Sequence, residues 1–138
     1  FQQMGGAFLG DRYYDVLYRN PGFGNSWIAI ELIGVVSNRS AIGTRIKVDI
    51  DDSGQQRFIF RHVNSGGSFG GNPLLQTIGL SSAKVIHRIE IFWPRSNMTQ
   101  VLEHIPVNCR IRVTEGKVGY ETIRSPKVAA APHRQNGK

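Results

Sequence analysis

The chain has 138 residues, and its 17 Lys and Arg against 10 Asp and Glu give a formal net charge of +7. Hydrophobic residues make up 40% of the sequence, a composition that is typical of a soluble globular domain and excludes a mainly disordered chain. The length fits one domain with a single core, and no apolar run approaches the roughly 18 residues of a transmembrane helix. Because Phe1–Met4 neither begins with Met nor resembles a signal peptide, we expect a piece of a longer protein.

Apolar and polar residues alternate with a period of two along much of the chain, and this pattern predicts β-strands. β-branched and aromatic residues fill the alternating segments, as half-buried strands require. The segments are Trp27–Ile33, Thr44–Ile50, Gln56–Val63, Val85–Trp93, Met98–Glu103 and Cys109–Thr114. No stretch sustains a helical period, although Ser81–Lys84 has the length of one helical turn. We therefore predict an all-β domain, an antiparallel β-sandwich or a partly closed barrel, with extended N- and C-terminal segments.

Turn-forming residues separate these segments. Asp51–Gly54 predicts a hairpin, because Gly54 can adopt a positive φ. Pro94–Asn97 predicts a second connection, because Pro94 cannot donate to a strand ladder. In the glycine-rich loop Ser65–Asn72, we expect the glycines to permit a tight crossing between sheets and Phe69 to plug the core. The same loop could bind an anion with its amides, but it lacks the Gly-Lys-Ser/Thr ending of a P-loop.

Few residues carry the patterns of catalysis or metal binding. Cys109 is the one cysteine, which excludes a disulfide framework, and its place on one strand face with Ile111 and Val113 predicts a buried, inert thiol. The four histidines lack zinc-ligand spacing. Asp49–Gly54 resembles the start of a calcium loop, but Phe60 stands where an EF-hand needs its last carboxylate. Glu31, Glu90 and Glu103 are expected on exposed faces of separate strands, so no pair of carboxylates stands out. We therefore predict that the protein is not an enzyme and has no cofactor and no metal site.

The order of the segments is more specific than any one of them. Ser37–Val48 reads SNRSAIGTRIKV and resembles the S-N-R-x-A-I-G-A-R-V signature of the ASPIC/UnbV domain, with Thr44 in place of the commoner Ala. Further stretches follow in the family's order: Ser65–Phe69, Ile78–Leu80, Ile89–Pro94 and Val107–Glu115. The turn Arg95–Asn97 departs from the family's usual one. The resemblance covers residues 25–116.

This resemblance implies a domain organisation and a location. In the family, the domain usually follows FG-GAP or VCBS-type repeats that build a β-propeller, as in proteins similar to cartilage acidic protein. Residues 1–24 then resemble the exit from the propeller, residues 25–116 form the sandwich, and residues 117–138 form a basic C-terminal tail. The implied location is extracellular or periplasmic, and the family supplies no catalytic residues. We interpret the residues shared with the family first as residues that serve packing. Gly43 would allow a close approach of the backbone, and Trp93 would anchor the core.

On this basis we predict that the domain is a non-catalytic interaction or assembly module. It would work through protein–protein contacts, which include adhesion. Aromatic residues of the loops and strand ends are the candidate contact groups: Phe23, Trp27 and Phe69. The alternative is binding of a carbohydrate or matrix polymer on the sandwich, with other aromatic residues as stacking platforms: Trp27, Tyr18 and Tyr120.

The positive charge is concentrated in the C-terminal tail. Arg124, Lys127, Arg134 and Lys138 give residues 124–138 a net charge of +4 without an acidic residue, which leaves +3 for residues 1–123. We expect this tail to dock on an anionic surface, as part of a larger assembly. Nucleic-acid binding by the tail is a further alternative, and it predicts binding that weakens steeply with salt.

Overall fold

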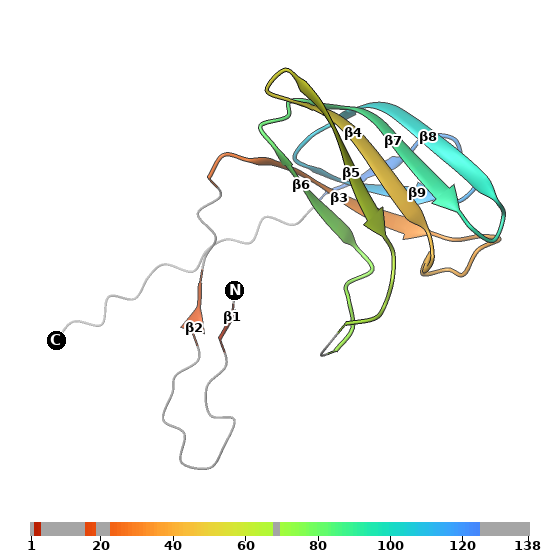
Figure 1. The fold of residues 1–138 in the computed structure, drawn as a ribbon. Coiled ribbons are helices and arrows are strands. Elements are labelled where there is room, and N and C mark those ends of the chain that lie inside the picture. The colour runs from red at the N-terminus through yellow and green to blue at the C-terminus, as the bar shows by residue number, and fades with distance from the viewer. Residues whose placement is uncertain (1, 4–15, 19–22, 68–69, 125–138) are drawn as a thin grey trace, which may run out of the picture.

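A computed structural model describes residues 2–3, 16–18, 23–67 and 70–124 (Figure 1). Within these residues the chain forms ten strands and no helix, so none of them lies in a helix that could cross a membrane. Two short strands, β1 (Gln2–Gln3) and β2 (Val16–Leu17), pair with each other before the main body begins. The remaining strands form two sheets of four strands each, which are not closed into a barrel. The sandwich predicted from the sequence is therefore confirmed.

The first sheet has the strand order β10-β9-β3-β6. Its strands are β3 (Ser26–Ile33), β6 (Gln76–Ser81), β9 (Cys109–Thr114) and β10 (Glu121–Ile123). Two of its pairings are antiparallel, but the central strands β3 and β9 run parallel, with Ile28 opposite Cys109 and Ile33 opposite Thr114. This parallel pair is a departure from the purely antiparallel sandwich expected from the sequence. It brings the C-terminal ends of β3 and β9 to the same end of the molecule.

The second sheet has the order β5-β4-β7-β8 and is antiparallel throughout. Its strands are β4 (Arg45–Asp52), β5 (Gln55–His62), β7 (Val85–Trp93) and β8 (Met98–Pro106). Two connections follow the sequence prediction: Ser53 and Gly54, at φ 59° and 84°, join β4 to β5, and a turn over residues 94–97 joins β7 to β8. Positive φ at both central residues is the signature of a type I′ hairpin, whose twist matches that of paired strands.

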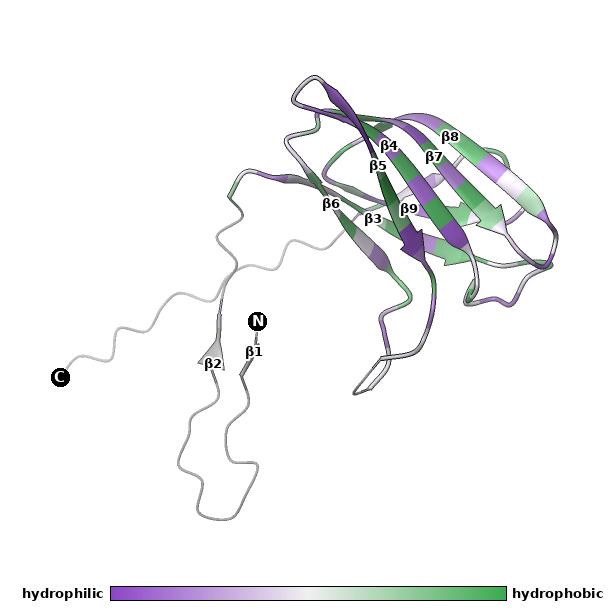
Figure 2. Ribbon diagram, in the orientation of Figure 1, coloured by the Kyte–Doolittle hydropathy of each residue, from purple (hydrophilic) through white to green (hydrophobic). Residues whose placement is uncertain are grey.

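The core lies between the two sheets and follows the alternation of the strands (Figure 2). Branched aliphatic residues of β3, β4 and β7 fill it, each fully buried: Ile28, Ile30, Ile46, Val48, Ile50, Ile89 and Ile91. Trp93, also fully buried at the end of β7, is the core anchor that the sequence predicted. The charged residues between these positions point outward, so each sheet has one dry face and one face in water.

Sequence analysis did not predict β6 and β10. β6 has only two buried apolar residues, Ile78 and Leu80, on either side of Gly79, which weakens the alternation signal. β10 lies within the segment assigned to the tail, yet its residues 121–123 pair with β9. The helical turn at residues 81–84 is absent: Ser81 ends β6 at φ 53°, and the amide of Ala83 donates to the carbonyl of Leu80.

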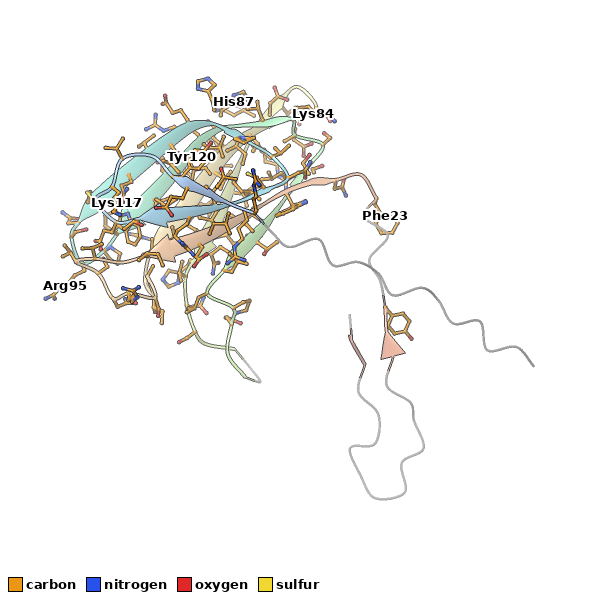
Figure 3. All side chains as sticks on the ribbon, turned by 180° about the vertical axis from the view of Figure 1, so that it is seen from behind. Phe23, Lys84, His87, Arg95, Lys117 and Tyr120 are labelled. Carbon is orange, nitrogen blue, oxygen red and sulfur yellow. The ribbon has the colours of Figure 1, made fainter. Side chains whose placement is uncertain are left out.

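The sandwich has two distinct ends, which we call the connecting end and the far end. β3 begins and β10 ends at the connecting end. Ala29 near the start of β3 and Ile123 at the end of β10 both pair with Arg110 of β9, so they lie at the same level of the sheet. The far end holds the loop of residues 34–44, the turn of residues 94–97 and the loop of residues 115–120 (Figure 1). Figure 3 shows Arg95 and Lys117 at the far end, away from Phe23.

Candidate functional site

A buried carboxylate organises the far end of the sandwich. Glu115 follows β9 directly and is 4% exposed. Its Oε2 accepts hydrogen bonds from the backbone amides of Val35, Val36 and Ser37 at 2.7, 2.8 and 2.7 Å. Its Oε1 accepts from the hydroxyls of Ser37 and Ser96 at 2.8 and 2.7 Å. We call this set of five residues the Glu115 clasp, because it joins three loops of the far end.

The clasp determines the protonation state of Glu115. Burial raises the pKa of this carboxyl, but the hydrogen bonds from Ser96, Ser37 and Val35 together outweigh burial and lower the pKa to about 2. Three successive amides that point at one oxygen form a backbone anion site, and here the chain's own side chain occupies it. Glu115 is thus a structural group that is ionised at neutral pH, with both carboxylate oxygens engaged in hydrogen bonds.

The other small and polar residues of Ser37–Gly43 also have structural tasks. The side chain of Asn38 closes the loop, since it donates to the carbonyl of Ile42 at 2.8 Å and accepts from the amide of Ile42 at 2.9 Å. Ala41 is fully buried at φ 55°. Gly43 has φ 97°, a left-handed conformation that favours glycine, and a Cβ there would lie at an ordinary contact distance of 3.4 Å from the Pro94 ring.

Arg39 in this stretch and Arg45 just after it, at the start of β4, face open surfaces instead. Arg39 is exposed, and its guanidinium forms no hydrogen bond or ion pair with any residue that the structure describes. Arg45 lies on the outer face of β4, with its guanidinium carbon 4.6 Å from the centre of the Phe92 ring. Each arginine lines a different cavity. Most residues of Ser37–Gly43 therefore build the far end, whereas Arg39 and the following Arg45 contribute to two different surfaces.

The first surface is the outer face of the second sheet. Strand pairing places Phe60 opposite Lys47, Phe58 opposite Asp49 and Phe92 opposite Arg45. Phe60 is 66% exposed and Phe58 44%, and the Lys47 Nζ lies 4.7 Å from the centre of the Phe58 ring. We call this surface the phenylalanine face and define it by Phe58, Phe60, Phe92, Arg45 and Lys47.

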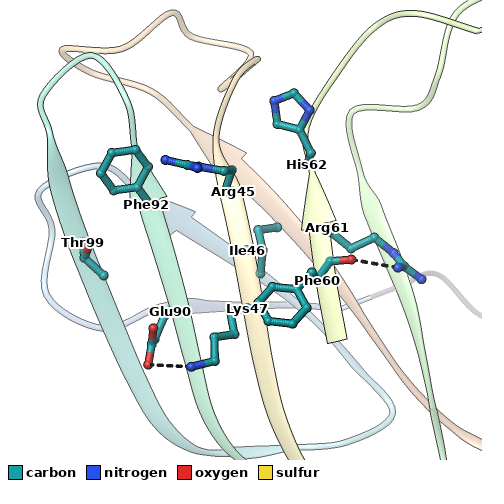
Figure 4. Close-up of a pocket in the computed structure, with 9 residues that line it drawn as sticks. All are labelled: Arg45, Ile46, Lys47, Phe60, Arg61, His62, Glu90, Phe92 and Thr99. Atoms are coloured by element: carbon teal, nitrogen blue, oxygen red, sulfur yellow. Dashed lines mark hydrogen bonds and ion pairs between the residues drawn. The ribbon is translucent and has the colours of Figure 1, made fainter. Parts of the chain in front are cut away.

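A cavity of about 430 Å³ opens on the phenylalanine face (Figure 4). Its lining combines aromatic rings with charged side chains: Phe60, Phe92, Arg45, Lys47, Arg61 and Glu90. Glu90 Oε1 lies 3.7 Å from Lys47 Nζ, and Arg61 Nη1 donates to the carbonyl of Phe60 at 3.0 Å. Arg45 and Lys47 share the cavity with one carboxylate, Glu90, whereas the Arg61 guanidinium extends away from them (Figure 4). Among these described residues the cavity is therefore apolar at its walls and positive in net charge.

The second surface is a polar groove of about 910 Å³ at the far end, on the first sheet. Charged and hydroxyl side chains that include Arg39 contribute to it: Glu31, Arg39, Arg112, Thr114, Lys117 and Glu121. Glu31 accepts from Arg110 Nη2 at 2.9 Å and from Arg112 Nη2 at 3.2 Å. The bond from Arg110, helped by Arg112, lowers the pKa of Glu31 against the opposing effect of burial. We call this cavity the far-end groove.

Four of the five aromatic residues proposed from the sequence are exposed but scattered. Trp27 begins β3 and is 37% exposed, and its amide donates to Asn108 Oδ1 at 3.1 Å. Tyr18 and Phe23 precede the sandwich, and Tyr120 lies between β9 and β10. Within the part of the chain that the structure describes, none of these four lines the phenylalanine-face cavity or the far-end groove.

The remaining predicted contact residues lie mostly outside the described residues, namely Phe69, Lys127, Arg134 and Lys138. Arg124 is exposed directly after β10. Sequence analysis missed Phe58 and Phe60 as surface residues, although a signal was available: Ile59 between them is the buried residue of β5, so both rings must face outward.

Among the residues that the structure describes, neither the thiol nor the histidines form a reactive cluster. Cys109 is half-buried against the core, its thiol donates to the carbonyl of Pro106 at 3.1 Å, and burial raises the thiol pKa. A raised pKa disfavours the nucleophilic thiolate. His62 and His87 are exposed, and the described residues contain no group of three or more His, Cys, Asp or Glu that could hold a metal ion.

Comparison with known proteins bears on the region that holds the phenylalanine face and part of the far-end groove. The model of the family described as ASPIC and UnbV matches residues 34–119. The match begins at Gly34 and extends past Glu115, so it spans the Glu115 clasp and the whole second sheet. No curated protein and no solved structure matches the chain significantly.

Proposed function

The chain belongs to the ASPIC and UnbV family, and from that premise we propose that it is a non-catalytic interaction module that binds a protein partner through the phenylalanine face. One observation carries this proposal: three phenylalanine rings and two cations share an open sheet face, and two of these rings, Phe60 and Phe92, line a cavity there together with both cations. Covering an exposed phenylalanine ring contributes about 1.5–3 kcal/mol. Aromatic and arginine side chains in an exposed pocket are the usual anchors of protein interfaces.

Charge indicates what kind of partner fits. Arg45 and Arg61 form no ion pair with the described residues, whereas Lys47 shares Glu90 with Arg88. An acidic segment would supply the missing carboxylates, and an apolar side chain beside them would enter between Phe60 and Phe92. We therefore propose a partner segment that carries Asp or Glu next to an aliphatic or aromatic residue, because both features of the cavity are then satisfied together.

A non-catalytic role agrees with the state of the reactive groups. Glu115 is the only buried charged residue among those described, and all its bonding capacity is used inside the clasp. The Cys109 thiol has a raised pKa. The half-buried carboxylate of Glu31 is held by Arg110 and Arg112, which lower its pKa and leave it a weak base.

The host protein and its location remain part of the same proposal. We propose an extracellular or periplasmic protein of the FG-GAP type, in which this domain follows a propeller and supports assembly or adhesion. The basic residues from Arg124 onward would then add attraction to an anionic partner surface.

The test is selection of peptide ligands on the full chain. A displayed random peptide library should yield sequences in which Asp or Glu flanks an apolar residue, and Phe60→Ala should weaken the selected peptides about tenfold or more. Val118→Ala is the control, because Val118 is fully exposed away from this face, and it should leave binding unchanged. Selection of neutral or basic peptides, or equal losses in both variants, would contradict the proposal.

A further inference from the structure

The far-end groove is separate from the phenylalanine face and has a different chemistry. It lies on the outer side of the first sheet, between the ends of β3 and β9, whereas the phenylalanine face belongs to the second sheet. Its volume of about 910 Å³ lies within the range of about 300–1,000 Å³ that is common for small-ligand sites. No aromatic side chain lines it among the described residues, so it offers no stacking platform and no deep apolar pocket.

Two cations in the groove are without a carboxylate partner. Neither the Arg39 guanidinium nor the Lys117 ammonium forms an ion pair with a residue that the structure describes, and both side chains are exposed. Arg39 is held in place by its own backbone, since its carbonyl accepts from the amide of Gly34 at 3.2 Å. The loop that the Glu115 clasp fixes therefore holds the backbone of Arg39 at the edge of the groove and leaves its guanidinium free, and the planar guanidinium suits the geometry of a carboxylate.

Hydrogen-bond acceptors stand beside these cations. Glu31 is fixed by Arg110 and Arg112 at 2.9 and 3.2 Å, and Arg112 also lies 3.8 Å from Glu121. Each carboxylate keeps further lone pairs for hydroxyl donors. The groove thus combines cations for one anionic group with fixed acceptors for several neutral donors.

From this combination we infer that the far-end groove binds a sugar acid, a uronate-containing oligosaccharide whose carboxylate meets Arg39 and Lys117 while its hydroxyls donate to Glu31 and Glu121. A peptide with several carboxylates fits less well, because Glu31 and Glu121 repel additional negative charge. A neutral sugar would leave both cations unused. The assignment does not depend on the phenylalanine face and goes beyond the proposed protein partner.

Titration of the full chain with short oligosaccharides that carry a single galacturonate, glucuronate or mannuronate among neutral sugars tests the assignment, with calorimetry as the readout. At least one series should bind, while neutral oligosaccharides of equal length should not. Arg39→Ala and Lys117→Ala should each weaken binding about tenfold, the loss of one charge-assisted contact. Binding should weaken at high salt and survive Phe60→Ala, which separates this result from the fate of the proposed protein partner.

Arg95→Ala and Lys84→Ala are the matched controls. Both side chains are exposed and lie outside the groove, Arg95 at the far end and Lys84 away from it (Figure 3), so both variants should bind as the parent does. The inference is overturned if no oligosaccharide with a single uronate binds at millimolar concentration, or if neutral sugars bind equally well. It is also overturned if a glutamate-rich peptide binds more tightly than the uronates in an Arg39-dependent manner, which would make the groove a peptide site.

Discussion

The Glu115 clasp and the phenylalanine face both use charged side chains, but the clasp uses them to stabilise the fold and the phenylalanine face presents them to solvent. In the clasp a carboxylate is withdrawn from water and receives five hydrogen bonds from one loop and one serine of a neighbouring turn. On the phenylalanine face, cations lie over aromatic rings in the open, with Phe60 still 66% exposed. The Glu115 carboxylate uses its hydrogen-bond acceptors within the protein and stabilises the fold. The cations and rings of the phenylalanine face remain exposed and are available to a partner.

This difference changes how the stretch Ser37–Gly43 is understood. A motif-like loop is often taken as the binding site, because function concentrates in loops. Here Ser37, Asn38, Ala41 and Gly43 each have a structural task. The candidate binding residues are the arginines at positions 39 and 45, together with phenylalanines on strands outside the stretch.

The largest expected effect comes from breaking the clasp. Glu115→Gln removes the charge and replaces an acceptor with a donor that faces the amides of Val35–Ser37, so it should lower the free energy of unfolding by about 3 kcal/mol or more. Denaturant unfolding of the full chain measures this. Glu103→Gln, at an exposed position on β8, should change stability by less than about 0.5 kcal/mol. Equal stability of the two variants would mean that the clasp does not hold the far end.

A second effect of similar size is the pH dependence of stability. Because the folded pKa of Glu115 is about 2 against an ordinary value of 4.5, its contribution is fully present above pH 4.5 and is lost as the pH falls toward 2. The difference corresponds to about 3 kcal/mol. Unfolding curves between pH 6 and pH 2 should show this loss in the parent chain, and Glu115→Gln should remove most of it. A parent and a variant with the same pH profile would contradict the assignment.

A smaller loss is expected at Gly34. A Cβ at this position would overlap the carbonyl oxygen of Asn38, and the required shift would disturb the amides that reach Glu115. We expect Gly34→Ala to cost about 2–3 kcal/mol in unfolding free energy. Gly66→Ala is the control, since its Cβ would meet no atom within 4 Å and its φ is not positive. If both variants unfold alike, the close packing of the loop is not a source of stability.

The smallest stability effect should come from the phenylalanine face. Phe60→Ala removes an exposed ring from β5, so it should change the free energy of unfolding by less than about 0.5 kcal/mol while weakening a selected acidic peptide. Thermal unfolding and peptide titration of the same sample separate the two effects. A stability loss as large as that of Glu115→Gln would make Phe60 a structural residue and remove the contrast between the two regions.

Sequence patterns predicted the strands with strong alternation and missed those with little of it. Thr44–Ile50 and Val85–Trp93 alternate over many residues, and the structure confirms both as β4 and β7. β6 and β10 are short, and their stability comes from neighbours that are distant in sequence, such as β3 for Ile78. The family assignment was likewise within reach of the sequence, because it rests on the order of several stretches.

The candidate sites were less predictable because they depend on contacts across the chain. Glu115 lies 78 residues from Ser37 in sequence, and no local pattern indicates that a carboxylate after β9 fills an anion site after β3. The outward direction of Phe58 and Phe60 could be deduced from Ile59. The positions of Arg45 and Lys47 beside these phenylalanine rings could not be deduced from the sequence. They depend on the register of β4 against β5 and β7, which is set by the turns and the core.

The most direct test of the contrast between these regions is a chemical-shift map of the isotope-labelled full chain with a selected acidic peptide. The account predicts that shifts concentrate at residues 45–47, 58–61 and 90–92, while the amides of Val35–Ser37, bonded to Glu115, stay in place. Shifts confined to residues 34–44, with the phenylalanine face unchanged, would contradict it.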